Sequence, residues 1–121
     1  MKTILLIEDE EIIYNLLQKK LTNEGYRVIL SKDGAEGIAA AQKEKPDLIL
    51  TDIIMPKKDG FEVLEAVKMD PNLSSVPVIV ISNSGQPVEL ERVKQLGAKD
   101  WLIKTEFDPK EVVDKVKKQI G

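Results

Sequence analysis

The chain has 121 residues, of which 42% are hydrophobic and 32% are charged, and its net charge is −3. This size and balance indicate one folded domain and exclude the disordered, collagen-like and membrane-spanning classes. Cysteine and histidine are both absent, which excludes disulfides, zinc sites built on thiolates and catalysis by imidazole.

Five short apolar runs alternate with amphipathic stretches along the chain and predict five β-strands. Four of the runs are nearly continuous, as in a parallel sheet that is covered on both faces. The second run carries Arg27 and is therefore expected at an edge of the sheet. The five runs are Ile4–Ile7, Arg27–Leu30, Leu48–Leu50, Val78–Ile81 and Trp101–Ile103.

The intervening stretches carry the start and stop signals of helices. Asp33, Asp59 and Asp108 are each followed by a glutamate three residues later, a spacing similar to that of a capping box. Gly25 and Gly97 are expected just beyond the ends of helices. Apolar stripes at helical spacing predict that the first and last helices each bury one face. The stripes consist of Ile12, Ile13, Leu16, Leu17 and Leu21 in the first helix, and Val112, Val113, Val116 and Ile120 in the last.

This alternation predicts a single α/β domain of the (βα)₅ type over residues 1–121, with right-handed crossovers. Functional groups of such sheets gather beyond the carboxyl ends of the strands. Polar residues follow four of the predicted strands, namely Glu8 with Asp9, Asp52, Ser82 and Lys104. Each has an ordinary explanation when taken alone, because helix starts attract Asp and Glu, and strand ends are rich in polar turn residues.

Taken together, these residues predict a site for phosphoryl transfer. Carboxylates gathered at one sheet edge repel one another strongly, and a hard cation such as Mg²⁺ relieves that repulsion. Without histidine or cysteine, Asp52 is the natural nucleophile and would form an acyl phosphate. Lys104 and Ser82 would then contact phosphoryl oxygens, since phosphoryl transfer depends mainly on positioning and charge neutralisation.

These motifs resemble the receiver domain of two-component response regulators, over essentially the whole chain. The segment from Pro46 to Gly60, which contains Asp52-Ile53-Ile54-Met55-Pro56 and Asp59-Gly60, is the most specific part. The resemblance implies a flavodoxin-like, doubly wound sheet in the strand order 2-1-3-4-5. It also implies a stand-alone receiver similar to the chemotaxis receivers, with no effector domain after Gly121.

The resemblance further implies a role for each site residue. Asp52 matches the phosphoacceptor, and Glu8 and Asp9 match the acidic pair that holds Mg²⁺ together with Asp52. The backbone carbonyl of Ile54 matches a further metal ligand. Ser82 matches the switch hydroxyl, Lys104 matches the lysine that pairs with the phosphoryl group, and Trp101 matches the aromatic residue whose rotamer reports activation.

The implied partners are proteins. The phosphodonor would be a histidine kinase or a histidine phosphotransfer protein, docking on the first helix and the loop after the fifth strand. Output would go to an unknown downstream protein through the surface of the fourth helix, fifth strand and fifth helix. The mixed charges and the lack of an apolar span or signal peptide predict a cytoplasmic protein that binds neither nucleic acid nor membrane. We expect a phosphoacceptor that assists its own phosphorylation and dephosphorylation, not a turnover enzyme.

Three residues depart from the family pattern. Thr105 follows Lys104 where the family usually has a cis-proline, and the cost of a cis bond before a non-proline residue predicts a trans bond here. Trp101 is larger than the usual tyrosine or phenylalanine, so a fixed, packed side chain is as plausible as a switching one. Ile54 is apolar where many members are polar, which predicts slower hydrolysis of the phosphorylated state.

Other functions stay open from the sequence alone. The main alternative is an interaction module with the receiver fold that is never phosphorylated. A phosphohydrolase is disfavoured because Ile54 stands where such enzymes usually place a second acid. A flavodoxin-like nucleotide binder is disfavoured because the acidic run from Glu8 to Glu11 would repel phosphate.

Overall fold

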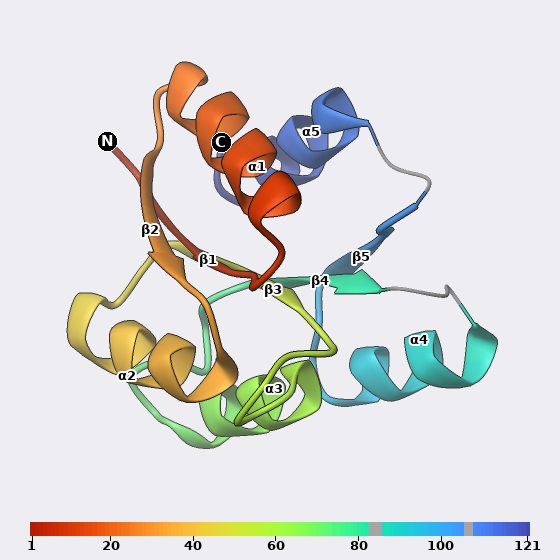
Figure 1. Ribbon diagram of the computed structural model, residues 1–121. Helices are drawn as coiled ribbons and strands as arrows, with labels where there is room; N and C mark the ends of the chain where they lie inside the picture. Colours follow the sequence, from red (N-terminus) through yellow and green to blue (C-terminus); the bar gives the residue numbers. More distant parts are fainter. Residues whose placement is uncertain (83–85, 106–107) are drawn as a thin grey trace.

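The chain folds around one parallel sheet, shown in Figure 1 as a computed structural model that describes residues 1–82, 86–105 and 108–121. The strands pair in the order β2-β1-β3-β4-β5, which confirms the predicted doubly wound arrangement and the edge position of the second strand. They are β1 (Thr3–Ile7), β2 (Arg27–Ser31), β3 (Leu48–Asp52), β4 (Val78–Ser82) and β5 (Asp100–Ile103).

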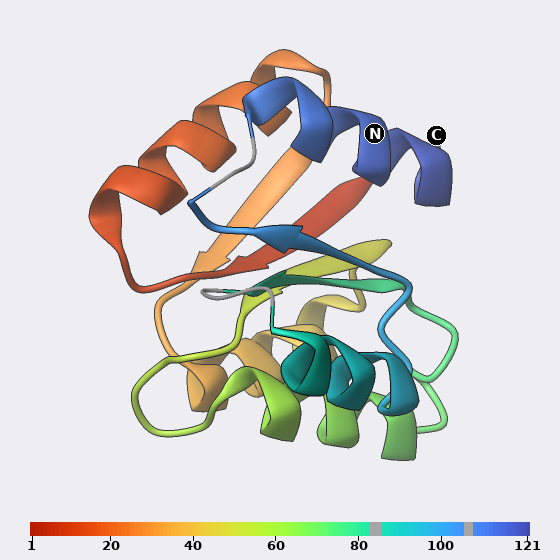
Figure 2. The ribbon, with the colours of Figure 1, turned by 90° about the vertical axis from the view of Figure 1, so that its right-hand side faces the viewer.

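Helices cover both faces of the sheet, as Figures 1 and 2 show. One face is covered by α1 (Glu11–Asn23) and α5 (Pro109–Ile120). The other is covered by α2 (Gly34–Glu44), α3 (Gly60–Met69) and α4 (Pro87–Gln95). All strands are parallel, so their carboxyl ends meet at one edge of the sheet, where the predicted site residues lie.

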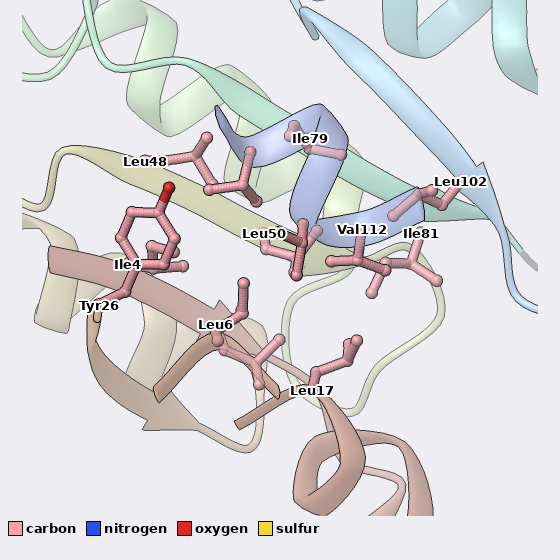
Figure 3. Close-up of a cluster of buried hydrophobic side chains, with 13 residues drawn as sticks. Ile4, Leu6, Leu17, Tyr26, Leu48, Leu50, Ile79, Ile81, Leu102 and Val112 are labelled. Atoms are coloured by element: carbon pink, nitrogen blue, oxygen red, sulfur yellow. The ribbon is translucent and has the colours of Figure 1, made fainter. Parts of the chain in front are cut away.

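Successive strand residues point to opposite faces and build two hydrophobic clusters. Ile4 and Leu6 of β1 join the cluster beneath α1 and α5, which Figure 3 shows. Leu5 and Ile7 join the cluster on the opposite face. The central strands β3 and β4 are buried along their whole length. This core holds the carboxyl ends of β1, β3 and β4 in a rigid frame.

The predicted helix signals are present at the expected places. The side chains of Asp33 and Asp108 accept hydrogen bonds from backbone N–H groups in the first turns of α2 and α5. Asp59 and Glu62 form a complete capping box at the start of α3. Gly25 and Gly97 follow α1 and α4 with φ of 95° and 99°, a left-handed conformation that glycine adopts without steric cost.

The predicted core stripe of α1 is wrong in part. Leu17 and Leu21 are buried and Ile13 packs against them, but Ile12 is 83% exposed and Leu16 is 42% exposed. The five apolar positions cover a wider arc than the sheet can bury, so the row formed by Ile12 and Leu16 faces solvent. In α5 the predicted stripe is confirmed, since Val112, Val113 and Val116 are buried and the half-buried Ile120 packs against the same cluster.

The helices of the described ranges are all shorter or more polar than a membrane crossing would require.

Candidate active site

Asp52 ends β3 and is almost completely buried, with 1% of its surface exposed. Its Oδ1 accepts a hydrogen bond of 2.7 Å from the backbone N–H of Ile53. The backbone around this residue is held by the start of α3, because the N–H of Gly60 donates to the carbonyl of Ile53 at 2.7 Å. A Cβ atom at Gly60 would lie 2.5 Å from the carbonyl oxygen of Asp52. Only glycine therefore allows α3 to approach the Asp52 backbone this closely.

Glu8 and Asp9 follow β1 and bring two more carboxylates to Asp52. One carboxylate oxygen from each of the three residues lies within 4.8 Å of the others. Glu8 is fully buried and Asp9 is exposed. Burial raises the pKa of Glu8 to about 7, although a hydrogen bond from the backbone N–H of Glu10 opposes the shift, and the Asp52 charge raises the pKa further. The site therefore carries an excess of negative charge that a cation would relieve.

Lys104 supplies a positive charge from the end of β5. Its Nζ lies 2.7 Å from Oδ2 of Asp52 and 3.2 Å from Oε1 of Glu8, and only 8% of its side chain is exposed. Burial lowers the pKa of Lys104, but the hydrogen bond to Asp52 and the charges of Asp52 and Glu8 outweigh it, so the pKa rises above its ordinary value. Lys104 is thus positioned as a charged group between two buried carboxylates.

Glu10 is a further partner of Lys104 that the sequence did not reveal. Its Oε1 lies 3.3 Å from Nζ of Lys104, and its side chain is 60% exposed. The acidic run after β1 contains four consecutive carboxylates, so the signal was present, but sequence spacing does not show which of them turn toward the lysine.

The donor set fits a hard divalent cation. Oε1 of Glu8 is buried and accepts no hydrogen bond from the described part of the chain, although Nζ of Lys104 is nearby. An oxygen buried without a hydrogen bond is costly, and a metal ion would satisfy it. Carboxylate oxygens are the ligands that Mg²⁺ and Ca²⁺ prefer. Glu8, Asp9 and Asp52 are therefore the residues that could hold such an ion.

Ser82 ends β4 beside this cluster and is fully buried. Its backbone carbonyl accepts a 2.7 Å hydrogen bond from the N–H of Lys104, which connects the ends of β4 and β5. The hydroxyl, however, donates a hydrogen bond to Oε1 of Glu89 in α4. The structure thus brings the Ser82 backbone to the predicted site, while its hydroxyl contacts a residue that the sequence did not single out.

The residues that depart from the family pattern lie around the same edge. The peptide bond between Lys104 and Thr105 is trans, since no cis peptide occurs in the described ranges, and this confirms the prediction. The following residues 106 and 107 lie outside those ranges. Ile54 presents an exposed side chain two residues after Asp52, with 65% of its surface accessible. Trp101 is half-buried and packs against the cluster beneath α2, α3 and α4.

Comparison with known proteins agrees with this geometry. The family described as "Response regulator receiver domain" matches residues 4–117. The alkaline phosphatase synthesis transcriptional regulatory protein PhoP of Bacillus subtilis (strain 168) is 38% identical over 116 residues. The match covers 96% of this chain and 47% of PhoP, so the chain spans about half the length of that relative.

Solved structures show the same fold over the full length of the chain. The chemotaxis response regulator CheY4 of Vibrio cholerae superposes with a TM-score of 0.92 at 30% identity, covering 99% of both chains. The receiver domain of sensor histidine kinase PA1611 from Pseudomonas aeruginosa PAO1 superposes with a TM-score of 0.91 at 29% identity, covering 99% of this chain and 98% of that one. That structure has a magnesium ion coordinated in its active site cleft.

Proposed function

We propose that Asp52 is the phosphoacceptor of this chain, which belongs to the family of response regulator receiver domains. Receiver domains are signalling modules that take phosphoryl groups from histidine kinases or phosphotransfer proteins. The observation that carries this assignment is the contact of 2.7 Å between Asp52 and Lys104, inside a cluster with Glu8 and Asp9. Residues 1–121 would act as one receiver domain.

The chemistry follows from the positions of these side chains. A carboxylate oxygen of Asp52 attacks the phosphorus of a phosphohistidine, the P–N bond breaks, and the imidazole leaves as an acyl phosphate forms on Asp52. Lys104 is close enough to Asp52 to transfer its ion pair from the carboxylate to a phosphoryl oxygen. Phosphoryl transfer requires such in-line positioning and charge neutralisation more than proton transfer.

Glu8, Asp9 and Asp52 would hold Mg²⁺, with the backbone carbonyl of Ile54 as a further ligand. The chemistry that bound Mg²⁺ supplies is positive charge against the phosphoryl oxygens. The magnesium ion in the PA1611 receiver domain supports this choice of metal, as does the buried Oε1 of Glu8. Since Ile54 offers no proton to a leaving group, a phosphohydrolase has no support from the site.

The phosphodonor would dock on α1 beside the site. Ile12 and Leu16 form an exposed apolar row on this helix, and a hollow at its start is lined by Glu10, Glu11, Ile12 and Asn15. Apolar side chains rimmed by polar ones are typical of protein–protein contacts. The hollow begins at Glu10, a partner of Lys104, so a donor bound there would lie next to Asp52.

Phosphorylation would change the surface formed by α4, β5 and α5, and this surface would bind a downstream protein. The phosphoryl group adds close to two negative charges, and Ser82 would turn its hydroxyl toward them. Asn83, Ser84 and Gly85, which we expect to close over the phosphoryl group, lie outside the described residues. Trp101 in β5 would report the change through its fluorescence, if its side chain moves with the switch.

Intact mass spectrometry tests the assignment. After incubation with acetyl phosphate and Mg²⁺, we expect the wild type to gain the mass of one phosphoryl group. Asp52→Asn, and wild type in EDTA, should gain nothing. No adduct on the wild type under any condition would favour the unphosphorylated interaction module, and an adduct that persists in Asp52→Asn would place the acceptor elsewhere.

A further inference from the structure

The hydroxyl of Ser82 is held on the α4 side of β4. It donates a hydrogen bond to Oε1 of Glu89, a half-buried residue in the first turn of α4. Ser82 itself is fully buried, so the donor side of this contact is shielded from water. Hydrogen bonds to an ionised carboxylate are stronger than those between neutral groups, and Glu89 is therefore an effective acceptor for this hydroxyl.

The backbone of Ser82 has little freedom to move. Its neighbour Ile81 pairs with Asp52 in the β3–β4 register, and Ser82 pairs with Ile103 in the β4–β5 register. Its carbonyl accepts the N–H of Lys104 at 2.7 Å. The simplest way for the hydroxyl to leave α4 is therefore rotation about χ1, which interconverts staggered rotamers of the side chain.

We infer that Glu89 is a positioning residue that holds the Ser82 hydroxyl away from Asp52 and so opposes the phosphorylated conformation. This inference rests on the proposed function, because it concerns the switch at the same site. A hydroxyl carries one proton, so it donates fully either to Glu89 or to a phosphoryl oxygen on Asp52. The two hydrogen bonds are alternatives, and each disfavours the other.

The same competition connects the phosphoryl group to α4. A phosphoryl group with nearly two negative charges is a stronger acceptor than a single carboxylate, so it draws the hydroxyl away from Glu89. Glu89 stands in the first turn of α4, next to Pro87 and the exposed Val88. Loss of the hydrogen bond removes one contact between the start of α4 and β4, and through it the change at Asp52 reaches α4.

A carboxylate in the first turn also stabilises a helix by itself, through the partial positive charge at the helix start. That ordinary role predicts that loss of Glu89 weakens α4 whatever residue occupies position 82. The positioning role predicts an effect that depends on Ser82. The two roles are therefore separated by combining substitutions at both residues.

The test measures the affinity of the Mg²⁺-loaded protein for beryllofluoride, which binds to carboxylates as a mimic of a phosphoryl group. Binding is followed by amide NMR shifts and by the fluorescence of Trp101. Glu89→Ala should bind the mimic about five- to tenfold more tightly than the wild type, because one hydrogen bond to a charged group no longer competes. Glu89→Gln, whose amide oxygen still accepts, should lie between the two.

Two controls make the result specific. Glu91→Ala removes an exposed carboxylate of the same helix, which accepts a hydrogen bond from the Gln95 side chain, and should bind the mimic as the wild type does. In a Ser82→Ala background, Glu89→Ala should bring no further gain in affinity for the mimic.

A separate NMR measurement tests the position of the hydroxyl directly. In the metal-free protein, the Hα–Hβ couplings of Ser82 should show one χ1 rotamer in the wild type and several in Glu89→Ala.

Equal affinities of Glu89→Ala and wild type would overturn the inference and leave the proposed function standing. So would the same gain in the Ser82→Ala background. A wild type that does not bind beryllofluoride in the presence of Mg²⁺ would instead overturn the proposed function, and the inference with it.

Discussion

Replacing Lys104 by methionine tests whether this side chain neutralises the buried carboxylates. Methionine keeps much of the volume and the apolar stem of lysine but removes the charge. Lys104 is 8% exposed, and its partners Glu8 and Asp52 are 0% and 1% exposed. Water therefore screens these charges only weakly, and both carboxylates would lack their counter-ion in the metal-free protein.

The magnitude follows from the distances. The ligand oxygens of the acidic cluster lie no more than 4.8 Å apart, so two unit charges there repel by at least about 3 kcal/mol at an effective dielectric constant near 20. Removal of one partner from a buried ion pair costs about 3–5 kcal/mol. We expect Lys104→Met to lower the free energy of unfolding by about 3–5 kcal/mol at about pH 8 in EDTA. Excess Mg²⁺ should restore part of the loss by binding the native state.

The assay is urea unfolding followed by the fluorescence of Trp101, the single tryptophan of the chain. Lys117→Met is the matched control, because Lys117 pairs with Glu24 at 2.9 Å but is 51% exposed. Exposed ion pairs contribute little, so this variant should unfold almost as the wild type does. If Lys104→Met loses no more stability than Lys117→Met, the cluster does not depend on its lysine and the reasoning is refuted.

Three further predictions concern the same site. Mg²⁺ should raise the melting temperature of the wild type but not of Asp9→Ala, measured by calorimetry; an equal increment in both would remove Asp9 from the metal site. In EDTA, the pKa of Glu8 of about 7 lies above its ordinary value of 4.5, so the folded state holds this proton more tightly than the unfolded state does. This contribution to stability is complete below about pH 4.5 and is lost as the pH rises through about 7. The urea concentration at the unfolding midpoint should therefore decrease as the pH is raised from about 5 to about 8, and it should decrease less in Glu8→Gln than in the wild type. An equal decrease in both proteins would contradict the raised pKa of Glu8. Ile54→Asn should lose its phosphoryl group several-fold faster than the wild type, because the exposed isoleucine hinders the approach of water to Asp52; unchanged decay of the phosphorylated mass would count against this role.

Much of the fold was predictable because local signals and burial agree. The continuous apolar runs of β1, β3 and β4 correspond to strands buried on both faces. The caps at Asp33 and Asp59 act within one helical turn, so spacing alone identifies them. The residues at the carboxyl ends of these strands were predictable for the same reason, since a parallel sheet brings those ends together.

Side-chain direction was not predictable from the same signals. The stripe of α1 has the right period, but periodicity does not show how wide an arc the sheet buries. The predicted core face therefore includes Ile12 and Leu16, which face solvent. The contact between Ser82 and Glu89 depends on the side-chain rotamer of Ser82 and on the position of α4 relative to β4. The pairing of Glu10 with Lys104 joins residues far apart in the chain, and no local pattern encodes it.

Chemical trapping tests most directly whether Asp52 carries the phosphoryl group. Borohydride reduces an acyl phosphate to an alcohol and thereby converts the phosphorylated aspartate to homoserine. Trypsin releases residues 44–57, a peptide that contains both Asp47 and Asp52, so tandem mass spectrometry compares the two within one molecule. After treatment with acetyl phosphate and Mg²⁺, we expect homoserine at position 52 and unmodified Asp47. Homoserine at another aspartate, with Asp52 unmodified, would contradict the assignment of the phosphoacceptor.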